Sequence, residues 1–326
     1  MPIKSILEAV RDTLREEMGR DSSIIVLGED VEEGGVFRAT EGLLAAFGGD
    51  RVLDMPLAES SIVGAAIGAS LNGLRPVAEI QFADFILPAV NQIISEAAKF
   101  RYRSAGDWTC PIVIRAPYGG GVHGGLYHSQ SMEALFAHHP GLKVVAPSTP
   151  YDIKGMLISA IRDPDPVLYF EHKRTYRLIK GEVPDGEYTV PIGKAEVRRE
   201  GEDLTLFSYG LALHQSLEAA EMVAAAGIDV EVVDLRTIYP LDRETILEAA
   251  KKTGKILIVH EDNLTGGVGG EVAALIAEQA FEYLDGPITR LAGPDVPAVP
   301  YNHALEDFYM LNPVKIAEAI RKLSAY

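Results

Sequence analysis

Residues 142–170 read LKVVAPSTPYDIKGMLISAIRDPDPVLYF, and this stretch decides the fold. Its first part, Leu142 to Ala146, is a short apolar run typical of a buried strand. Thr149 then supplies a cap and Pro150 to Arg162 begins with a proline at the first helical position, which predicts a helix. A second apolar run, Val167 to Phe170, predicts another strand. A strand, a helix and a strand in succession predict two parallel strands with the helix packed on one face of their sheet.

The same alternation extends along the rest of the chain. A polar, turn-rich stretch, Lys180 to Tyr188, separates two regions that each contain strands and helices in turn. The sequence therefore predicts an α/β protein with two domains, residues 1–185 and 186–326, each built on a parallel sheet covered on both faces. Strands are predicted at 24–27, 77–82, 112–116, 204–208, 230–233 and 256–259, and helices at 60–71, 86–103, 215–226, 243–252, 272–283 and 313–323.

Composition and charge narrow the classes of function. The 326 residues are 47% hydrophobic and 24% charged, which is ordinary for a soluble globular protein. The formal net charge of −17 disfavours nucleic acid and anionic membranes, because binding to either depends on Lys and Arg neutralising phosphates. An acidic surface can instead recruit a basic protein partner. The apolar stretches are too short to cross a membrane.

The N-terminus and the single cysteine indicate a compartment. The first twenty residues carry acidic side chains and no long apolar segment, so we expect neither a secretory signal nor a transit peptide. Cys110 alone cannot form a disulfide within the chain and fits a reducing environment. The expected location is the cytoplasm.

Two glycine-rich stretches match nucleotide-binding motifs only in part. Gly119 to Gly124 follows a predicted strand, but no helix opens after it and no acidic residue stands near position 140. Gly266 to Gly270 lacks the third glycine of the pattern. The chain also contains no P-loop, no nucleophile elbow and no zinc-binding helix motif, which disfavours hydrolase and metalloprotease functions.

Two residues stand out as candidates for chemistry. Glu59 is a lone carboxylate at the start of a nearly all-apolar helix. It could serve only to stabilise the helix N-terminus, or burial could raise its pKa so that it exchanges a proton near neutral pH. His128 lies in a glycine-rich loop after a strand, where it could be an ordinary surface histidine or could approach a ligand closely.

Further candidates lie at the carboxyl ends of predicted strands, where parallel α/β sheets bind their ligands. Glu29 and Asp30 follow one strand, and Gln81 to Phe85 ends another. Phe85 by itself could be a plain core residue.

Six stretches together closely resemble the β subunit of the thiamine-diphosphate-dependent decarboxylating component of 2-oxo acid dehydrogenase complexes. The likeness covers nearly the whole chain. It implies a pyrimidine-binding domain of the thiamin-diphosphate-binding fold, followed by a domain like the transketolase C-terminal domain. The stretches are 26–31 (VLGEDV), 56–59 (PLAE), 79–85 (EIQFADF), 128–131 (HSQS), 140–145 (PGLKVV) and 233–237 (VDLRT).

The resemblance also implies roles for single residues. Glu59 matches the glutamate that hydrogen-bonds the pyrimidine ring of thiamine diphosphate and thereby activates the cofactor. His128 matches a histidine near the substrate that serves proton transfer during acyl transfer to a lipoyl group. Phe85 matches an aromatic residue that packs on the pyrimidine, often tyrosine in relatives. The remaining matches to residues that line the cofactor or substrate are Glu29, Leu57, Ala58 and Gln81.

Partners and ions follow from the same resemblance. Family members form α2β2 heterotetramers with a β–β contact, and thiamine diphosphate lies between an α and a β chain. The Gly-Asp-Gly and Asn-Asn signature for magnesium diphosphate occurs nowhere in this chain, so magnesium is expected on the α subunit. The acidic surface is expected to dock the basic subunit-binding domain of the acyltransferase core, whose lipoyl domain receives the acyl group. A potassium site is expected at the matching positions, Ile112, Ala160, Ile161, Asp163 and Asp165.

The loop 126–131 (LYHSQS) looks more like branched-chain 2-oxo acid enzymes than like pyruvate enzymes. The expected function is therefore that of a branched-chain 2-oxo acid dehydrogenase β subunit, active only with its α subunit. Three alternatives remain open: a pyruvate dehydrogenase β subunit, half of a split transketolase-like enzyme, and a scaffold subunit without catalysis. A degenerate scaffold would have lost the acid or the loop histidine, whereas this chain retains Glu59 and His128.

Overall fold

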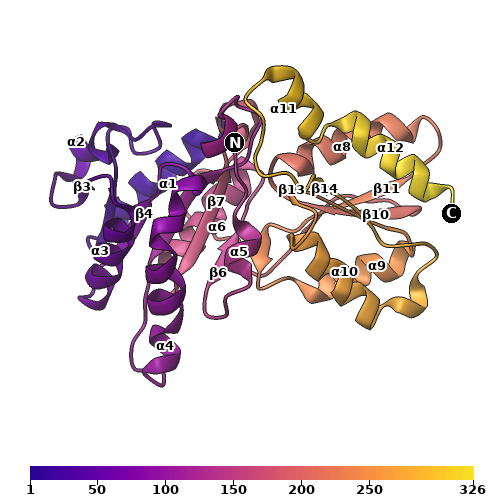
Figure 1. The fold of residues 1–326 in the computed structure, drawn as a ribbon. Helices are drawn as coiled ribbons and strands as arrows, with labels where there is room; N and C mark the ends of the chain where they lie inside the picture. The colour runs from indigo at the N-terminus through magenta and orange to yellow at the C-terminus, as the bar shows by residue number, and fades with distance from the viewer. The chain divides into compact units, whose positions relative to one another are not determined.

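The computed structural model describes residues 1–326, and the chain divides into two compact units (Figure 1). The first unit comprises residues 1–118 and 135–192, and the second comprises residues 119–134 and 193–326. The main division falls between Ile192 and Gly193, later than the expected one after residue 185. Val183 and Val190 explain the difference, because both are buried in the hydrophobic core of the first unit.

A parallel sheet forms the centre of the first unit. Its strands follow the order β6-β7-β5-β4-β2-β3, and each neighbouring pair is parallel, as predicted. The strands are β2 (Ile24–Gly28), β3 (Val52–Asp54), β4 (Arg75–Glu79), β5 (Val113–Tyr118), β6 (Lys143–Val145) and β7 (Val167–His172), with β1 (Ile3–Ser5) and β8 (Lys180–Glu182) paired separately.

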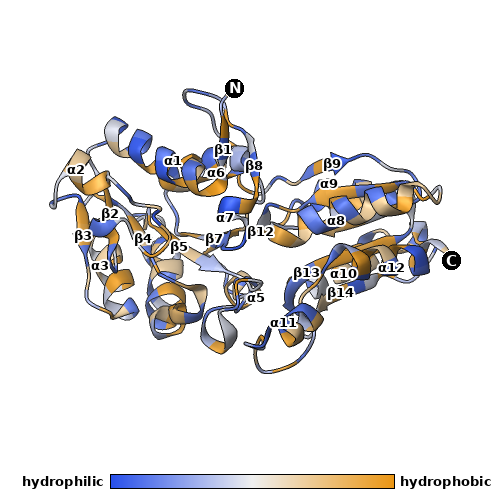
Figure 2. Ribbon diagram, turned by 90° about the horizontal axis from the view of Figure 1, so that it is seen from above, coloured by the Kyte–Doolittle hydropathy of each residue, from blue (hydrophilic) through white to orange (hydrophobic).

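Helices cover this sheet because each has one apolar face. In α1 (Ile6–Arg20) residues such as Val10, Leu14 and Met18 are buried, and Figure 2 shows hydrophobic and hydrophilic colours on the same helix. These residues share one core with α6 and with strands of the sheet. The other helices here are α2 (Leu43–Phe47), α3 (Glu59–Leu71), α4 (Phe100–Arg103), α6 (Pro150–Arg162) and α7 (Thr175–Leu178), with a 3-10 turn at Val31–Glu33.

The helix predicted at 86–103 is not regular. The structure has a 3-10 segment at Ala83–Ala89, a π-helical segment at Asn91–Glu96, a short 3-10 turn at Ala97–Lys99 and then α4. Pro88 lies inside the first segment and has no N–H to donate to a preceding carbonyl, which interrupts a regular α-helix. The apolar periodicity of the sequence indicated a buried helical segment, but it did not predict this change of helix type.

The second unit has a five-stranded sheet in the order β14-β13-β10-β11-β9. All pairs are parallel except that of β9 with β11, which is antiparallel at the sheet edge. Its elements are β9 (Glu196–Arg199), β10 (Leu204–Ser208), α8 (Gly210–Ala224), β11 (Val230–Asp234), β12 (Thr237–Tyr239), α9 (Arg243–Thr253), β13 (Ile256–Asn263), α10 (Val268–Gln279), β14 (Thr289–Gly293), α11 (His303–Tyr309) and α12 (Pro313–Ser324), with 3-10 turns at Gly125–Tyr127 and Phe281–Tyr283. The short helix α5 (Glu133–Ala137) begins in this unit and ends in the first. No helix of the chain combines the length and apolar character that a membrane crossing requires.

Candidate active site

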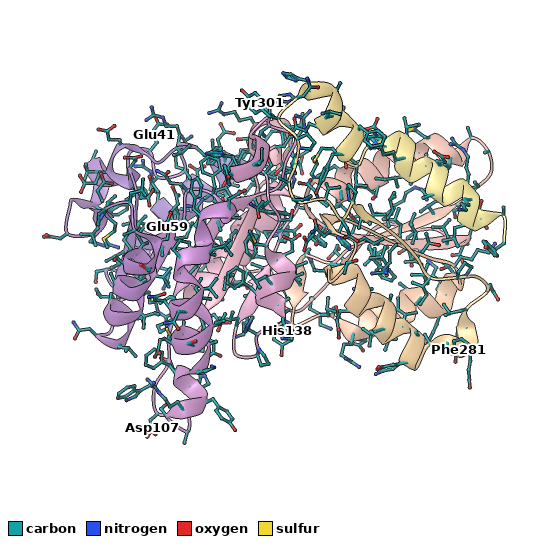
Figure 3. All side chains as sticks on the ribbon, in the orientation of Figure 1. Glu41, Glu59, Asp107, His138, Phe281 and Tyr301 are labelled. Carbon is teal, nitrogen blue, oxygen red and sulfur yellow. The ribbon has the colours of Figure 1, made fainter.

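Glu59 is the first residue of α3 and is labelled in Figure 3. Ala58 precedes it at the helix cap and has no side chain that could cap the helix. Only 7% of Glu59 is exposed, which is unusual for a carboxylate in a first helical turn. The next turns bury Ile62, Val63 and Ala66, so apolar packing draws this end of the helix into the protein. Both the helix-terminus role and a buried catalytic role agree with this position.

Glu29 distinguishes between these two roles. It follows β2 at the carboxyl end of the parallel sheet and is buried, and its Oε1 atom has no hydrogen-bond partner. Burial raises the pKa of Glu29, and the nearby charges of Glu59 and Asp30 raise that pKa further. Two buried carboxyl groups thus lie close enough to interact, and one has an unsatisfied oxygen. A ligand that donates hydrogen bonds or shares a proton would relieve this arrangement.

Aromatic rings and an amide lie in the segment after β4. The Gln81 side chain donates to Asp30 at 3.0 Å, so this segment is tied to the loop that follows β2. Phe85 makes an edge-to-face contact with Phe82 at 5.5 Å between ring centroids, and Phe82 meets Phe37 in the same way at 5.3 Å. The structure therefore brings Glu29, Glu59, Gln81 and Phe85 into the first unit.

Leu57 and Ala58 complete the expected cofactor-lining residues. Ala58 is half-buried, whereas 82% of Leu57 is exposed. A single exposed leucine is ordinary on a protein surface, so Leu57 by itself does not mark a ligand site.

A buried ion-pair network joins strands β4, β5 and β7 near their carboxyl ends. The sequence did not predict it. Arg115 on β5 is fully buried and bonds Glu79 at 2.5 Å and both carboxylate oxygens of Glu171 at 2.7 Å. The Tyr176 hydroxyl donates to Glu171 at 2.5 Å. Removing one partner of such a network would leave a buried charge uncompensated. An arginine inside the apolar strand 112–116 was the signal that could have revealed it.

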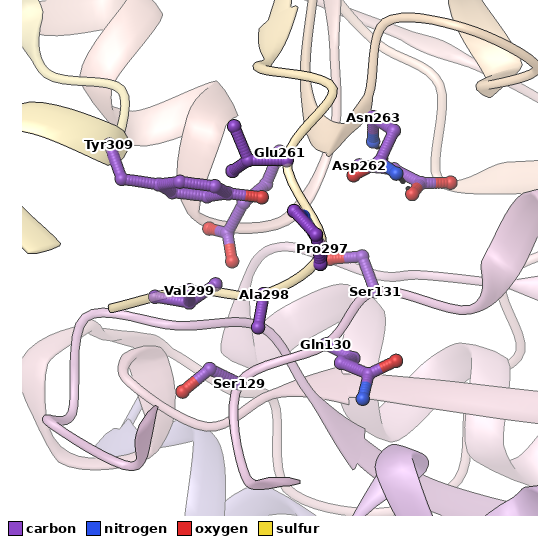
Figure 4. A pocket seen from close by; sticks show the side chains of 11 residues that line it. Ser129, Gln130, Ser131, Glu261, Asp262, Asn263, Pro297, Ala298, Val299 and Tyr309 are labelled. Carbon is purple, nitrogen blue, oxygen red and sulfur yellow. Dashed lines mark hydrogen bonds between the residues drawn. The ribbon is translucent and has the colours of Figure 1, made fainter. Parts of the chain in front are cut away.

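His128 belongs to the second unit. It follows the 3-10 turn Gly125–Tyr127, is partly buried, and precedes the buried Ser129. The next residues line a small cavity of about 80 Å³ (Figure 4). Its lining residues are Ser129, Gln130, Ser131, Glu261, Asp262, Asn263, Val296, Pro297, Ala298, Val299 and Tyr309. His128 therefore lies beside a polar cavity of its own unit. The sequence did not predict this cavity.

The oxygens expected around a potassium ion already have donors. The carbonyls of Ile161 and Asp163 accept from the Arg75 guanidinium at 2.9 and 3.3 Å. The Ala160 carbonyl accepts from the Asp163 amide, and the Ile112 carbonyl from the Val167 amide. Lys143 contacts both Asp163 carboxylate oxygens at 2.6 Å, and Arg101 bonds Asp165 at 2.5 Å. Three cationic side chains thus lie among these oxygens and pair with both carboxylates, so we predict that a further monovalent cation does not bind here.

We expect Arg75→Met to lower the thermal stability of the chain, because the carbonyls of Ile161 and Asp163 lose their donor. The cost is about 1–3 kcal/mol, or a few degrees in Tm. Melting in potassium chloride and in choline chloride at equal ionic strength measures it. Wild type should melt at the same temperature in both salts. Arg103→Met, on a side chain that is 60% exposed, is the control. A potassium-specific rise in the wild-type Tm would contradict this reading.

Two carboxyl groups lie near the His128 loop, that of Glu133, which is buried, and that of Asp262, which is half-buried. Burial is the main cause that raises the pKa of both Glu133 and Asp262, and each also feels neighbouring carboxylates. The Tyr209 hydroxyl donates to Glu133 at 2.8 Å. A raised carboxyl pKa means that the folded state keeps a proton that the unfolded state has already released.

This difference predicts a pH dependence of stability. The contribution of protonated Glu133 is fully present below its ordinary pKa of 4.5 and is lost as the pH rises toward the raised folded value. The free energy of unfolding of wild type should therefore fall relative to Glu133→Gln between about pH 5 and pH 8, by at most ~1.4 kcal/mol per pH unit. Denaturant titrations across this range measure it, with exposed Glu248→Gln as control. Parallel profiles for wild type and Glu133→Gln would refute the prediction.

Comparisons with known proteins agree with this geometry. Residues 4–179 match the family described as "Transketolase, pyrimidine binding domain", and residues 193–316 match "Transketolase, C-terminal domain". The "2-oxoisovalerate dehydrogenase subunit beta" of Bacillus subtilis is 61% identical, with 100% of both chains covered. The "Pyruvate dehydrogenase E1 component subunit beta" of the same organism is 48% identical, with 98% of both covered. A solved structure described as "Split gene transketolase, inactive beta4 tetramer" has a TM-score of 0.79 at 26% identity, covering 98% of each chain.

These matches span both units and include β subunits of 2-oxo acid dehydrogenases. The two-domain α/β fold expected from the sequence is confirmed by the same findings. The chain belongs to the transketolase-like family of 2-oxo acid dehydrogenase β subunits, of the 2-oxoisovalerate dehydrogenase type.

Proposed function

We propose that this chain, together with an α subunit, decarboxylates a branched-chain 2-oxo acid with thiamine diphosphate and passes the acyl group to a lipoyl carrier. The observation that carries the proposal is the buried pair Glu29 and Glu59, with one oxygen unsatisfied, at the carboxyl end of the parallel sheet. The high identity to a 2-oxoisovalerate dehydrogenase β subunit supports the choice of substrate class.

The first unit fits the pyrimidine half of thiamine diphosphate. Glu29 and Glu59 would face the ring's nitrogen donors, and Phe85 would pack against the ring. When bound, the cofactor supplies the electron sink that decarboxylation requires. Glu59 would hold a proton at a pyrimidine nitrogen, because a buried carboxyl group can hydrogen-bond such a nitrogen and exchange a proton with it.

The second unit would contribute His128 as the proton-transfer residue of the acyl-transfer step. An imidazole is suited to this task because its ordinary pKa lies near neutrality. The α chain would hold the diphosphate and its magnesium in an α2β2 heterotetramer. We therefore expect isolated β chains to bind thiamine diphosphate poorly and to show no turnover.

The test is a reconstitution with the α chain from the same source. Carbon dioxide release should be faster from 3-methyl-2-oxobutanoate than from pyruvate, and ketol transfer between sugar phosphates should be absent. Preference for pyruvate would favour a pyruvate dehydrogenase β subunit, as named among the relatives. Ketol transfer would favour half of a split transketolase, the kind of protein named for the similar solved structure. Turnover by β alone would overturn the shared-site proposal.

The acidic net charge of −17 suggests a docking partner of opposite charge. We propose that a basic subunit-binding domain of an acyltransferase core binds the second unit of this chain. Its Kd should rise steeply between about 50 and 500 mM salt, because screening weakens contacts between exposed charges. Titration calorimetry across this range measures the effect, with sucrose at matched osmolality as the control. A Kd that does not change with salt would eliminate the electrostatic part of the proposal.

A further inference from the structure

The loop that carries His128, residues 119–134, belongs to the second unit and is held by side chains of that same unit. We propose that Glu306 and Glu261 are positioning residues that hold this loop so that His128 can act in acyl transfer. The inference rests on the role proposed for His128. Neither carboxylate stood out in the sequence, because each lies more than a hundred positions from the loop.

Glu306 on α11 holds the middle of the loop. Only 1% of it is exposed, and its Oε1 atom accepts from the backbone amide of Gly121 at 2.9 Å and from that of His123 at 3.3 Å. Its Oε2 atom contacts Nδ1 of His123, whose ring lies 3.5 Å from that of His303. One buried carboxylate thus accepts two backbone hydrogen bonds and contacts a side chain of the loop, which fixes the loop path far better than a single bond would.

Glu261, at the end of β13, holds the start of the loop. Its exposure is 8%, and its Oε1 atom accepts from the Gly120 amide at 2.5 Å. The loop is closed by a bond from the Gly119 amide to the Gln130 carbonyl at 3.0 Å. Residues between these two points, including His128, are therefore confined at both ends.

Close packing transmits this anchoring to His128. A Cβ atom at Gly124 would lie 2.7 Å from the Cβ of His128, so the histidine packs directly on the glycine backbone. A Cβ at Gly120 would lie 2.9 Å from the sulfur of Met310, so the anchored end of the loop packs closely against this side chain. His123 has a positive φ of 57°, a conformation that a non-glycine residue keeps only when its surroundings impose it. The contacts to Glu306 supply that constraint.

The test separates two half-reactions in the reconstituted α/β complex. Decarboxylation is followed with an artificial electron acceptor, and acyl transfer is followed by reductive acylation of a lipoyl domain. Glu306→Ala should lower kcat of acyl transfer by about 10²-fold, the cost of a displacement of roughly 1 Å. Decarboxylation and the KM for the 2-oxo acid should stay within about threefold. Glu306→Gln keeps an oxygen acceptor and should retain most of the activity.

Controls keep the outcomes distinct. Asp307→Ala, on an exposed neighbour of the same helix, should match wild type in both half-reactions. Gly124→Ala should reproduce the selective loss by pushing His128 itself, even if Glu306→Ala fails to fold. If His128→Gln leaves acyl transfer intact, the proposed role of His128 fails. If His128→Gln lowers acyl transfer while Glu306→Ala or Gly124→Ala does not, the positioning inference is overturned.

Discussion

Glu59→Gln is expected to lower the decarboxylation rate of the reconstituted α/β complex by about 10²- to 10⁴-fold. This is the rate enhancement that a positioned acid–base group usually contributes. The glutamine keeps the size of the side chain and loses its ability to exchange a proton. Glu59 is buried beside Glu29, where only a carboxyl group can share a proton with the cofactor ring. Initial rates of carbon dioxide release at saturating thiamine diphosphate measure the effect.

A control separates catalysis from helix stabilisation. Glu271 also lies in the first turn of a helix, α10, but is exposed. Glu271→Gln should change stability by less than about 1 kcal/mol and leave the rate unchanged. If Glu59→Gln behaved like Glu271→Gln, Glu59 would be only a helix-terminus charge and the proposed mechanism would be lost.

His128→Gln is expected to reduce reductive acylation of the lipoyl domain by about 10²- to 10⁴-fold while decarboxylation with an artificial acceptor continues. Glutamine preserves hydrogen bonding but cannot carry a proton near neutral pH. Stopped-flow acylation of the lipoyl domain by wild type and by the variant provides the measurement.

The matched control is His138→Gln, on an exposed histidine labelled in Figure 3. It should leave both half-reactions unchanged. Equal losses in decarboxylation and acyl transfer for His128→Gln would show that the histidine serves the whole site and not the transfer step.

The local sequence pattern was sufficient to predict the strand that precedes Glu29 and the helix at Glu59. The apolar run Ile24 to Leu27 is a strand, and the helix predicted from Ser60 begins one residue earlier, at Glu59. Such patterns work because side-chain period and capping chemistry depend on near neighbours in the chain. The change of helix type after Phe82 was not predicted, because it depends on how the surrounding packing accommodates Pro88.

Sequence alone determined the α/β class, the two-domain order and the candidates Glu59 and His128, since these rest on periodicity and on whole-chain likeness. Only the tertiary structure placed Glu29 beside Glu59, put Arg75 on the carbonyls expected to bind potassium, and joined the His128 loop to Glu261 and Glu306. Each of these contacts joins residues far apart in the chain. Burial, charge coupling and hydrogen-bond partners arise from proximity in space, which short-range pattern does not encode.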